Sequence, residues 1–324
     1  MMDHPTEEQT QPAAVRLRGI VKSFGTGDTK VTVLRGIDLD IYLGEMLLLV
    51  GESGGGKTTL LSAIAGILEI DAGNIDVLGV PLSDLPAGKR TTFRGKTMGF
   101  IYQQFNLLPA LTAAENVAVP LLIQHIGRRE ALHRARTMLE RVGLSGAASK
   151  KVDQLSGGQR QRIGIARALA LKPQLIVADE PVSALDVSIQ AQVVNLLDDL
   201  QRELGLSYLF IAHDLSVVQH ISDRVVVMYL GKVMEVSNTK ELFENPKHPY
   251  TKALLSAVPI PDPKLERQRE RIILQGDLPS PANPPSGCVF NTRCWKVQDK
   301  CRTEVPLLRK DASDTEVACH FPLS

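Results

Sequence analysis

The segment GESGGGKT, residues 51–58, restricts the fold more than any other part of the chain. It matches the pattern G-x-x-x-x-G-K-[ST], in which glycines let consecutive backbone N–H groups turn inward around phosphate oxygens. The apolar run EMLLLVG (45–51) precedes it, and the helical pattern KTTLLSAIAGIL (57–68) follows it. A buried strand, a glycine-rich loop and a helix in this order predict a phosphate-binding loop, whereas a chance glycine-rich turn would not require either flanking element.

Further apolar runs alternate with amphipathic helical patterns along residues 15–258. PQLIVADE (173–180) and SYLFIAHD (207–214) are typical of buried strands, and SIQAQVVNLLDDLQREL (188–204) is typical of an amphipathic helix. This alternation predicts an α/β fold with a parallel sheet and helices on its faces. The helical pattern ALHRARTMLERVGL (131–144) interrupts the alternation and indicates an inserted helical subdomain.

Composition argues against several other classes of protein. The 324 residues carry a formal net charge of +1, so the overall charge gives no argument for nucleic-acid binding. Residues 1–14 are polar, lack the pattern of a secretory signal, and are predicted to form a disordered tail. The sequence has no apolar run of about eighteen residues, so we expect no membrane span. We therefore expect a cytosolic chain, in which structural disulfides are rare.

Polar residues end two of the predicted strands at the sheet edge that also carries the phosphate loop. Asp179 follows the apolar run LIVA and could reach Mg²⁺, and Glu180 is then a candidate general base for the attacking water. His213 ends the run YLFIA in the same way. Each residue alone could belong to a solvated turn or a structural contact, but together they predict one site. In that site Lys57 would contact the β- and γ-phosphates, and Thr58 would ligate Mg²⁺.

The segment LSGGQRQR, residues 155–162, opens another helical pattern. Ser156, Gly157 and Gly158 offer a hydroxyl and backbone N–H groups at a helix N-terminus, which predicts a second anion site. The alternative is an ordinary serine cap with a flexible entry. One nucleotide does not need two such sites on one chain. Two chains packed head to tail would let each LSGGQ loop close over the γ-phosphate held by the other chain.

Together these motifs resemble the ATP-binding subunit of an ABC transporter over residues 15–258. The resemblance rests on GESGGGKT, LSGGQ, LIVADE, SALD and His213. It implies the P-loop NTPase ABC ATPase core, with a parallel sheet, an antiparallel β subdomain and an inserted helical subdomain at about 104–170. An irregular C-terminal extension with four cysteines would follow at 259–324. No strongly expected catalytic position is missing, so we expect an active ATPase.

The resemblance also assigns roles to residues that the motifs alone do not. It implies that Gln103 senses the γ-phosphate and Mg²⁺, with Gln104 as the adjacent alternative, and that Asp186 crosses a dimer interface. Phe24 would stack on adenine, although an aromatic at this place could equally be a core residue of an edge strand. The predicted catalytic residues are Glu180, His213 and Gln103, the predicted Mg²⁺ ligands are Thr58, Gln103 and Asp179, and the predicted ATP-binding residues are Phe24, Gly51, Ser53, Gly54, Gly56, Lys57, Thr58, Thr59, Asp179, Ser156, Gly157, Gly158, Gln159 and Asp186.

The resemblance further implies partners and a location. The partners would be a second ATP-binding subunit, identical or related, integral membrane permease subunits and an extracytoplasmic substrate-binding protein, with no nucleic acid. The chain would lie peripherally on the cytoplasmic face of the inner membrane. A soluble ABC ATPase of translation or DNA repair is the alternative from another class. The first normally has two nucleotide domains and the second a long coiled coil, whereas this chain has one phosphate loop and no heptad run.

The two halves of the chain resemble different transporter classes. TMGFIYQQFNLLPALTAAENVAVPLL (97–122) is similar to the class that serves lipoprotein release and macrolide export. The chain from Leu155 onward, including NPKHPYTKALLSAVPIPDP (245–263), is similar to oligopeptide and dipeptide importers. The C-terminal features favour peptide import, with an export-type or lipoprotein-releasing permease as the alternative. The conflict suggests the hypothesis that the chain is a chimera of two related subunits.

All four cysteines, Cys288, Cys294, Cys301 and Cys319, lie in the C-terminal extension. The cytosolic setting disfavours a disulfide, and zinc sites favour a tighter C-x2-4-C pair. Inert thiols and an iron–sulfur cluster, which tolerates varied spacing, both remain open. Similar peptide-importer subunits carry such cysteines, some with a [4Fe–4S] cluster. The resemblance therefore implies a cluster held by these four residues, with a structural or regulatory role distant in sequence from the ATP site.

Overall fold

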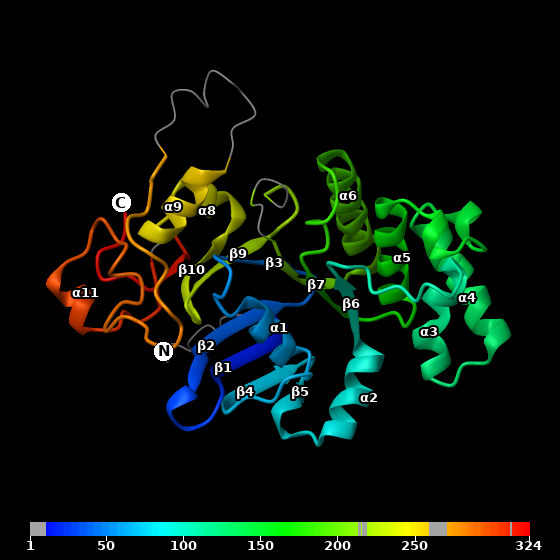
Figure 1. The fold of residues 1–324 in the computed structure, drawn as a ribbon, viewed down its shortest axis with the longest axis horizontal. Helices are drawn as coiled ribbons and strands as arrows, with labels where there is room; N and C mark the ends of the chain where they lie inside the picture. The colour runs from blue at the N-terminus through cyan, green and yellow to red at the C-terminus, as the bar shows by residue number, and fades with distance from the viewer. Residues whose placement is uncertain (1–10, 213–214, 216–218, 259–270, 312) are drawn as a thin grey trace, which may run out of the picture.

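Two β-sheets, flanked by helices, form the framework of the protein in this computed structural model (Figure 1). The structure describes residues 11–212, 215, 219–258, 271–311 and 313–324. The described strands are β1 (Ala13–Phe24), β2 (Val31–Tyr42), β3 (Met46–Val50), β4 (Ala72–Val77), β5 (Val80–Pro81), β6 (Met98–Tyr102), β7 (Leu175–Asp179), β8 (Ser207–Ile211), β9 (Arg224–Tyr229), β10 (Lys232–Asn238), β11 (Arg309–Lys310) and β12 (Glu316–Val317). The described α-helices are α1 (Lys57–Ile64), α2 (Ala87–Thr97), α3 (Ala113–Ile123), α4 (Arg128–Arg141), α5 (Gly157–Leu169), α6 (Val187–Leu204), α8 (Thr239–Glu244), α9 (Pro249–Ala257) and α11 (Asp299–Thr303).

The larger sheet has the strand order β11-β12-β10-β9-β3-β8-β7-β6. Strands β9, β3, β8, β7 and β6 run parallel to one another, and β3 and β8 are buried along their whole length. Burial on both faces explains why these strands are continuous apolar runs in the sequence. The prediction of a parallel sheet was incomplete, because β10, β12 and β11 add an antiparallel edge and make the sheet mixed.

The smaller sheet is antiparallel, with the order β2-β1-β4-β5, and corresponds to the predicted β subdomain. Its apolar face shares a core with α1 and with one face of β3, for example through Leu17, Leu60 and Leu47. Strand β1 begins at Ala13, so the predicted disordered tail of 1–14 is wrong at its last two residues. The carbonyl of Ala14 accepts a hydrogen bond from the N–H of Leu78, which fixes this end of the chain to the sheet.

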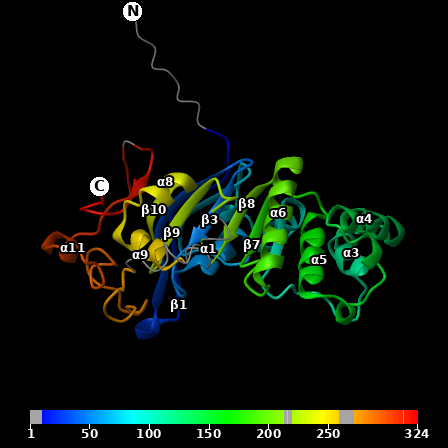
Figure 2. The same ribbon diagram turned by 90° about the horizontal axis from the view of Figure 1, so that it is seen from above.

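Helices α3, α4 and α5 pack together and form a lobe at one end of the molecule, within the range predicted for the helical subdomain. A capping box starts α3, in which Thr112 and Glu115 each bind the other's backbone N–H. The C-terminal extension lies at the opposite end of the molecule, as both views show (Figures 1 and 2). The central sheet, which carries the phosphate loop, lies between the two.

The C-terminal extension is built into the core and is not a separate appendage. Strand β12 pairs with β10 in the register Glu235↔Val317, which satisfies the backbone groups of an otherwise open sheet edge. Phe290 and two of the cysteines belong to the same apolar cluster as residues of β3 and α5. Among the described residues, no helix combines the length and apolar character needed to cross a membrane.

Candidate nucleotide-binding site

The phosphate loop connects β3 to α1 in the conformation that its glycines require. Gly51 has φ +146°, and a Cβ atom there would lie 2.1 Å from the carbonyl oxygen of Met228. Gly56 has φ +93° and directly precedes the first residue of α1. Both positions need glycine, because a side chain would meet neighbouring backbone or adopt a left-handed conformation. Ser53, Gly54 and Thr58 are exposed on this loop, and Thr59 is half-buried.

Lys57 lies buried at the start of α1, where the charges of the predicted site residues Asp179 and Glu180 act on it. Its Nζ donates hydrogen bonds to the carbonyl oxygens of Gly51, at 2.8 Å, and Glu52, at 3.0 Å. Burial lowers the pKa of Lys57, and the charges of Glu180, Asp179 and Glu52 oppose that shift. The Lys57 ammonium suits a ligand with several negative charges, whereas the carboxylates around it would repel such a ligand unless a cation neutralised them.

Asp179, Glu180 and Gln103 lie together at the carboxyl ends of β7 and β6. Asp179 pairs with Tyr102, so Gln103 is the first residue beyond β6. Glu180 has φ +47°, a left-handed value that is unusual for a non-glycine residue, and its N–H donates to the carbonyl of Ile211 on β8. Gln103 and Gln104 are both exposed. His213 lies outside the described residues.

Phe24 at the end of β1 is an exposed aromatic residue and not part of the core, since 44% of its surface is accessible. The Nζ atom of Lys22 lies 5.6 Å from the centroid of its ring. The structure thus argues against the alternative of an edge-strand core residue. An aromatic face open to solvent beside a cation is suited to stacking with a planar base.

The LSGGQ segment forms the N-terminus of α5 in the helical lobe. The hydroxyl of Ser156 accepts from the N–H of Gln159, while the side chain of Gln159 accepts from the N–H of Ser156. In this single chain Ser156 therefore acts as the N-cap of α5, which is the alternative considered for the LSGGQ segment. Gly158 packs against Ile189, where a Cβ atom would lie 2.6 Å from a side-chain carbon, while Gly157 is exposed. Asp186 caps α6 by accepting from the N–H of Ile189, which lowers the pKa of its carboxyl group.

Two arginines that hold the site loops were missed by the sequence analysis. Arg167 on α5 donates to the carbonyl oxygens of Phe105, at 2.8 Å, and Asn106, at 2.5 Å. It thereby ties the segment after Gln103 to the LSGGQ helix. Arg293 of the C-terminal extension forms an ion pair with Glu52 of the phosphate loop. The expected separation of the extension from the ATP site therefore holds along the sequence but not in space.

The four cysteines line one small enclosed cavity of about 10 Å³. They are free thiols, and burial raises the pKa of Cys288 to about 11 and also raises the pKa of Cys294 and Cys319. His248 lines the same cavity, with its Nδ1 accepting from the N–H of Tyr250. Across the described residues, however, no three His, Cys, Asp or Glu side chains stand close enough to hold a metal ion.

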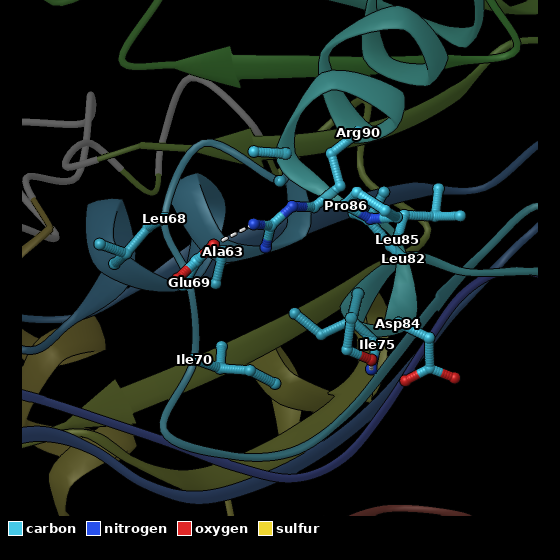
Figure 3. Close-up of a pocket in the computed structure, with 13 residues that line it drawn as sticks. Ala63, Leu68, Glu69, Ile70, Ile75, Leu82, Asp84, Leu85, Pro86 and Arg90 are labelled. Atoms are coloured by element: carbon cyan, nitrogen blue, oxygen red, sulfur yellow. Dashed lines mark hydrogen bonds and ion pairs between the residues drawn. The ribbon is translucent and has the colours of Figure 1, made fainter.

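A separate hollow of about 400 Å³ lies between the end of α1 and the start of α2 (Figure 3). Its floor is apolar, with Ile70, Ile75 and Leu82, and an ion pair between Arg90 and Glu69 lies across it. None of the predicted site residues lines this hollow. We therefore treat it as distinct from the nucleotide site.

Comparison with known proteins identifies the family of the chain. The family model for the ABC transporter matches residues 34–183, and the model for the oligopeptide/dipeptide transporter C-terminal region matches residues 234–301. The oligopeptide transport ATP-binding protein OppF of Haemophilus influenzae is 50% identical over 291 residues, which cover 88% of this chain and 87% of that protein. OppF of Salmonella typhimurium is 51% identical over 278 residues, which cover 84% and 83%.

The fold is similar to that of a solved ATP-binding cassette, MJ0796, in a dimeric post-hydrolysis state bound to ADP and Pi. The TM-score is 0.64 at 34% sequence identity, over 69% of this chain and 98% of that chain. The relatives named for oligopeptide transport match both halves of the chain without a break in class, so the comparisons do not indicate a chimera. Motifs, fold and near full-length relatives agree that the chain is an ABC ATPase and belongs to the ABC transporter ATP-binding subunits with the oligopeptide/dipeptide transporter C-terminal region.

Proposed function

We propose that this chain hydrolyses ATP at the phosphate loop to power the import of di- and oligopeptides. The main support for an ATPase site is the buried ammonium group of Lys57, on which the charges of both Asp179 and Glu180 act. Lys57 and the loop N–H groups bind the β- and γ-phosphates, and Glu180 takes a proton from the attacking water. Gln103 and His213 orient that water and the γ-phosphate, and Phe24 stacks on the adenine.

The residues around the loop fit a magnesium ion. Thr58 offers an exposed hydroxyl beside Lys57, and Asp179 offers a carboxylate at the end of a buried strand. Proteins hold Mg²⁺ with one or two such side chains plus phosphate oxygens and water, so a dense cage of ligands is not required. When bound, the ion neutralises charge on the phosphates. Thr58, Asp179 and Gln103 are its proposed ligands.

We infer that two chains, identical or related, pack head to tail around two nucleotides. The cassette of similar fold is described as dimeric and bound to ADP and Pi. The exposed LSGGQ loop supports this arrangement, because the Ser156 hydroxyl accepts a bond in the capping box and still has a proton to donate. In the dimer Ser156, Gly157, Gly158 and Gln159 face the γ-phosphate of the other chain, and Asp186 lies at the interface.

Peptide import rests on the relatives named for oligopeptide transport and on the matched C-terminal region. The proposed partners are permease subunits in the membrane and an extracytoplasmic binding protein for peptides, with this chain peripheral on the cytoplasmic side of the inner membrane. The tagged chain should be captured from membranes, its partners identified by mass spectrometry, and peptide uptake compared between wild-type and Glu180→Gln cells. Capture of a lipoprotein-releasing or macrolide-export permease, with unchanged peptide uptake, would reject this proposal.

A [4Fe–4S] cluster bound to Cys288, Cys294, Cys301 and Cys319 is the proposed occupant of the cysteine cavity. Support comes from the donor set, since four thiols line one small cavity. No three of these four described thiols stand close enough in this structure to hold a metal ion, so a bound cluster would have to draw them together. A cluster would cross-link the extension as a structural element. The test is anaerobic purification, with iron and sulfide assays and a visible absorption spectrum. Brown protein with about four iron atoms per chain is expected, and colourless protein with stoichiometric zinc would reject the cluster.

A further inference from the structure

The C-terminal extension contacts the phosphate loop directly through Arg293 and Glu52. One guanidinium nitrogen, Nη1, donates to Oε1 of Glu52 at 3.0 Å and to Oε2 at 2.8 Å. The Arg293 side chain is only 11% exposed and that of Glu52 28% exposed, so water screens this pair less than a surface ion pair. Arg293 directly precedes Cys294, one of the four cysteines around the cavity.

A second contact holds the backbone of the same loop residue. The N–H of Glu52 donates to the hydroxyl of Tyr250 at 2.9 Å, and the carbonyl of Glu52 accepts from Lys57. Tyr250 packs against Tyr229 and Phe290, with ring centroids 4.7 Å and 5.3 Å away. The amide, carbonyl and carboxylate of Glu52 are thus all engaged, two of them by residues from the C-terminal part of the chain.

The charge of Glu52 matters because it lies close to the group that binds phosphate. Glu52 is one of the three carboxylates whose charge acts on Lys57. An uncompensated carboxylate here would attract the Lys57 ammonium and repel the triphosphate. Arg293 compensates this charge. Its backbone N–H donates to the carbonyl of Phe290, which is fully buried in the extension.

We propose that Arg293 is a positioning residue for ATP binding, which acts by holding and neutralising Glu52 of the phosphate loop. Through this pair the C-terminal extension sets the ATP affinity of the motor. The inference rests on the proposed assignment of residues 51–58 to the phosphates of ATP. It gives the extension a role in the ATPase reaction beyond any cluster that it holds.

The test measures ATP affinity by calorimetry and ATPase kinetics on the full chain and four variants. Arg293→Ala should weaken ATP binding by ~10-fold, the loss expected for a partly buried hydrogen-bonded charge pair. It should raise KM and leave kcat nearly unchanged, because the interaction stabilises bound ATP and the transition state equally. Adding Glu52→Gln to Arg293→Ala should restore most of the affinity, since the unpaired charge is gone. Arg302→Ala, which removes an exposed arginine of the same extension, is the matched control.

Three results would contradict the proposed role of Arg293 or the phosphate-loop assignment beneath it, and each points to a different cause. Unchanged ATP affinity in Arg293→Ala, with only a lower melting temperature, would make Arg293 purely structural and overturn the inference. Failure of Glu52→Gln to restore affinity in the double variant would also overturn it, because charge compensation would not be the cause. Wild-type ATP affinity in Lys57→Ala would instead reject the assignment of the phosphate loop, on which the inference rests.

Discussion

Replacing Phe290 with alanine should destabilise the whole protein, because the extension shares its core with the ATPase. Phe290 is fully buried, and its ring centroid lies 5.3 Å from those of both Tyr229 and Tyr250. Removal of a buried phenylalanine side chain costs about 3–5 kcal/mol, from lost transfer free energy and from the cavity left behind. Phe290 contacts residues of β9 and α9, so its replacement should lower the stability of the central sheet as well as that of the extension.

The assay is urea denaturation of the full chain. Unfolding is monitored with two spectroscopic probes, one in the parallel sheet and one in the extension. Trp295→Ala is the control, because this residue lies in the same segment but is 46% exposed, and it should cost about 1 kcal/mol or less. Phe290→Leu should recover most of the loss, because it refills most of the cavity. Equal stability of Phe290→Ala and Trp295→Ala would refute the idea that the extension belongs to the core.

Three further outcomes are expected. Glu180→Gln should retain ATP binding and lose steady-state phosphate release by about 100-fold or more, and normal turnover would contradict its role as general base. Gly51→Ala should impair folding and ATP binding more than Gly54→Ala, because a Cβ at Gly51 would lie 2.1 Å from a carbonyl oxygen whereas one at Gly54 meets nothing within 4 Å; equal effects would contradict this. Burial raises the pKa of Glu45 against the opposing charge of Arg224 and with the help of Asp223. The contribution of protonated Glu45 to the free energy of unfolding is fully present below the pKa of an unfolded glutamate. It is lost as the pH rises through the raised pKa of Glu45 in the folded protein. The denaturation midpoint of Glu45→Gln should therefore not show this decrease with rising pH.

Candidate residues for the nucleotide site could be proposed from the sequence because several of them lie at the end of a locally recognisable element. The loop at 51–58 follows an apolar strand, and Asp179 ends another. Strand ends of a parallel sheet meet at one edge, so the motifs alone bring these groups together. The sequence could not decide whether Phe24 is exposed, and it misjudged the start of the first strand. Both depend on which strands become neighbours, which local periodicity does not encode.

By itself the sequence determined the ATP motor. The strand, the loop and the helix that define it are each encoded by a few consecutive residues, and their backbone groups form hydrogen bonds within the same element or with close neighbours. Only the tertiary structure decided where the extension lies. Arg293 and Glu52 are 241 positions apart, and β12 joins the sheet edge at β10. Such contacts form because packing the extension buries apolar surface and pairs an open edge, and that free energy depends on the whole fold.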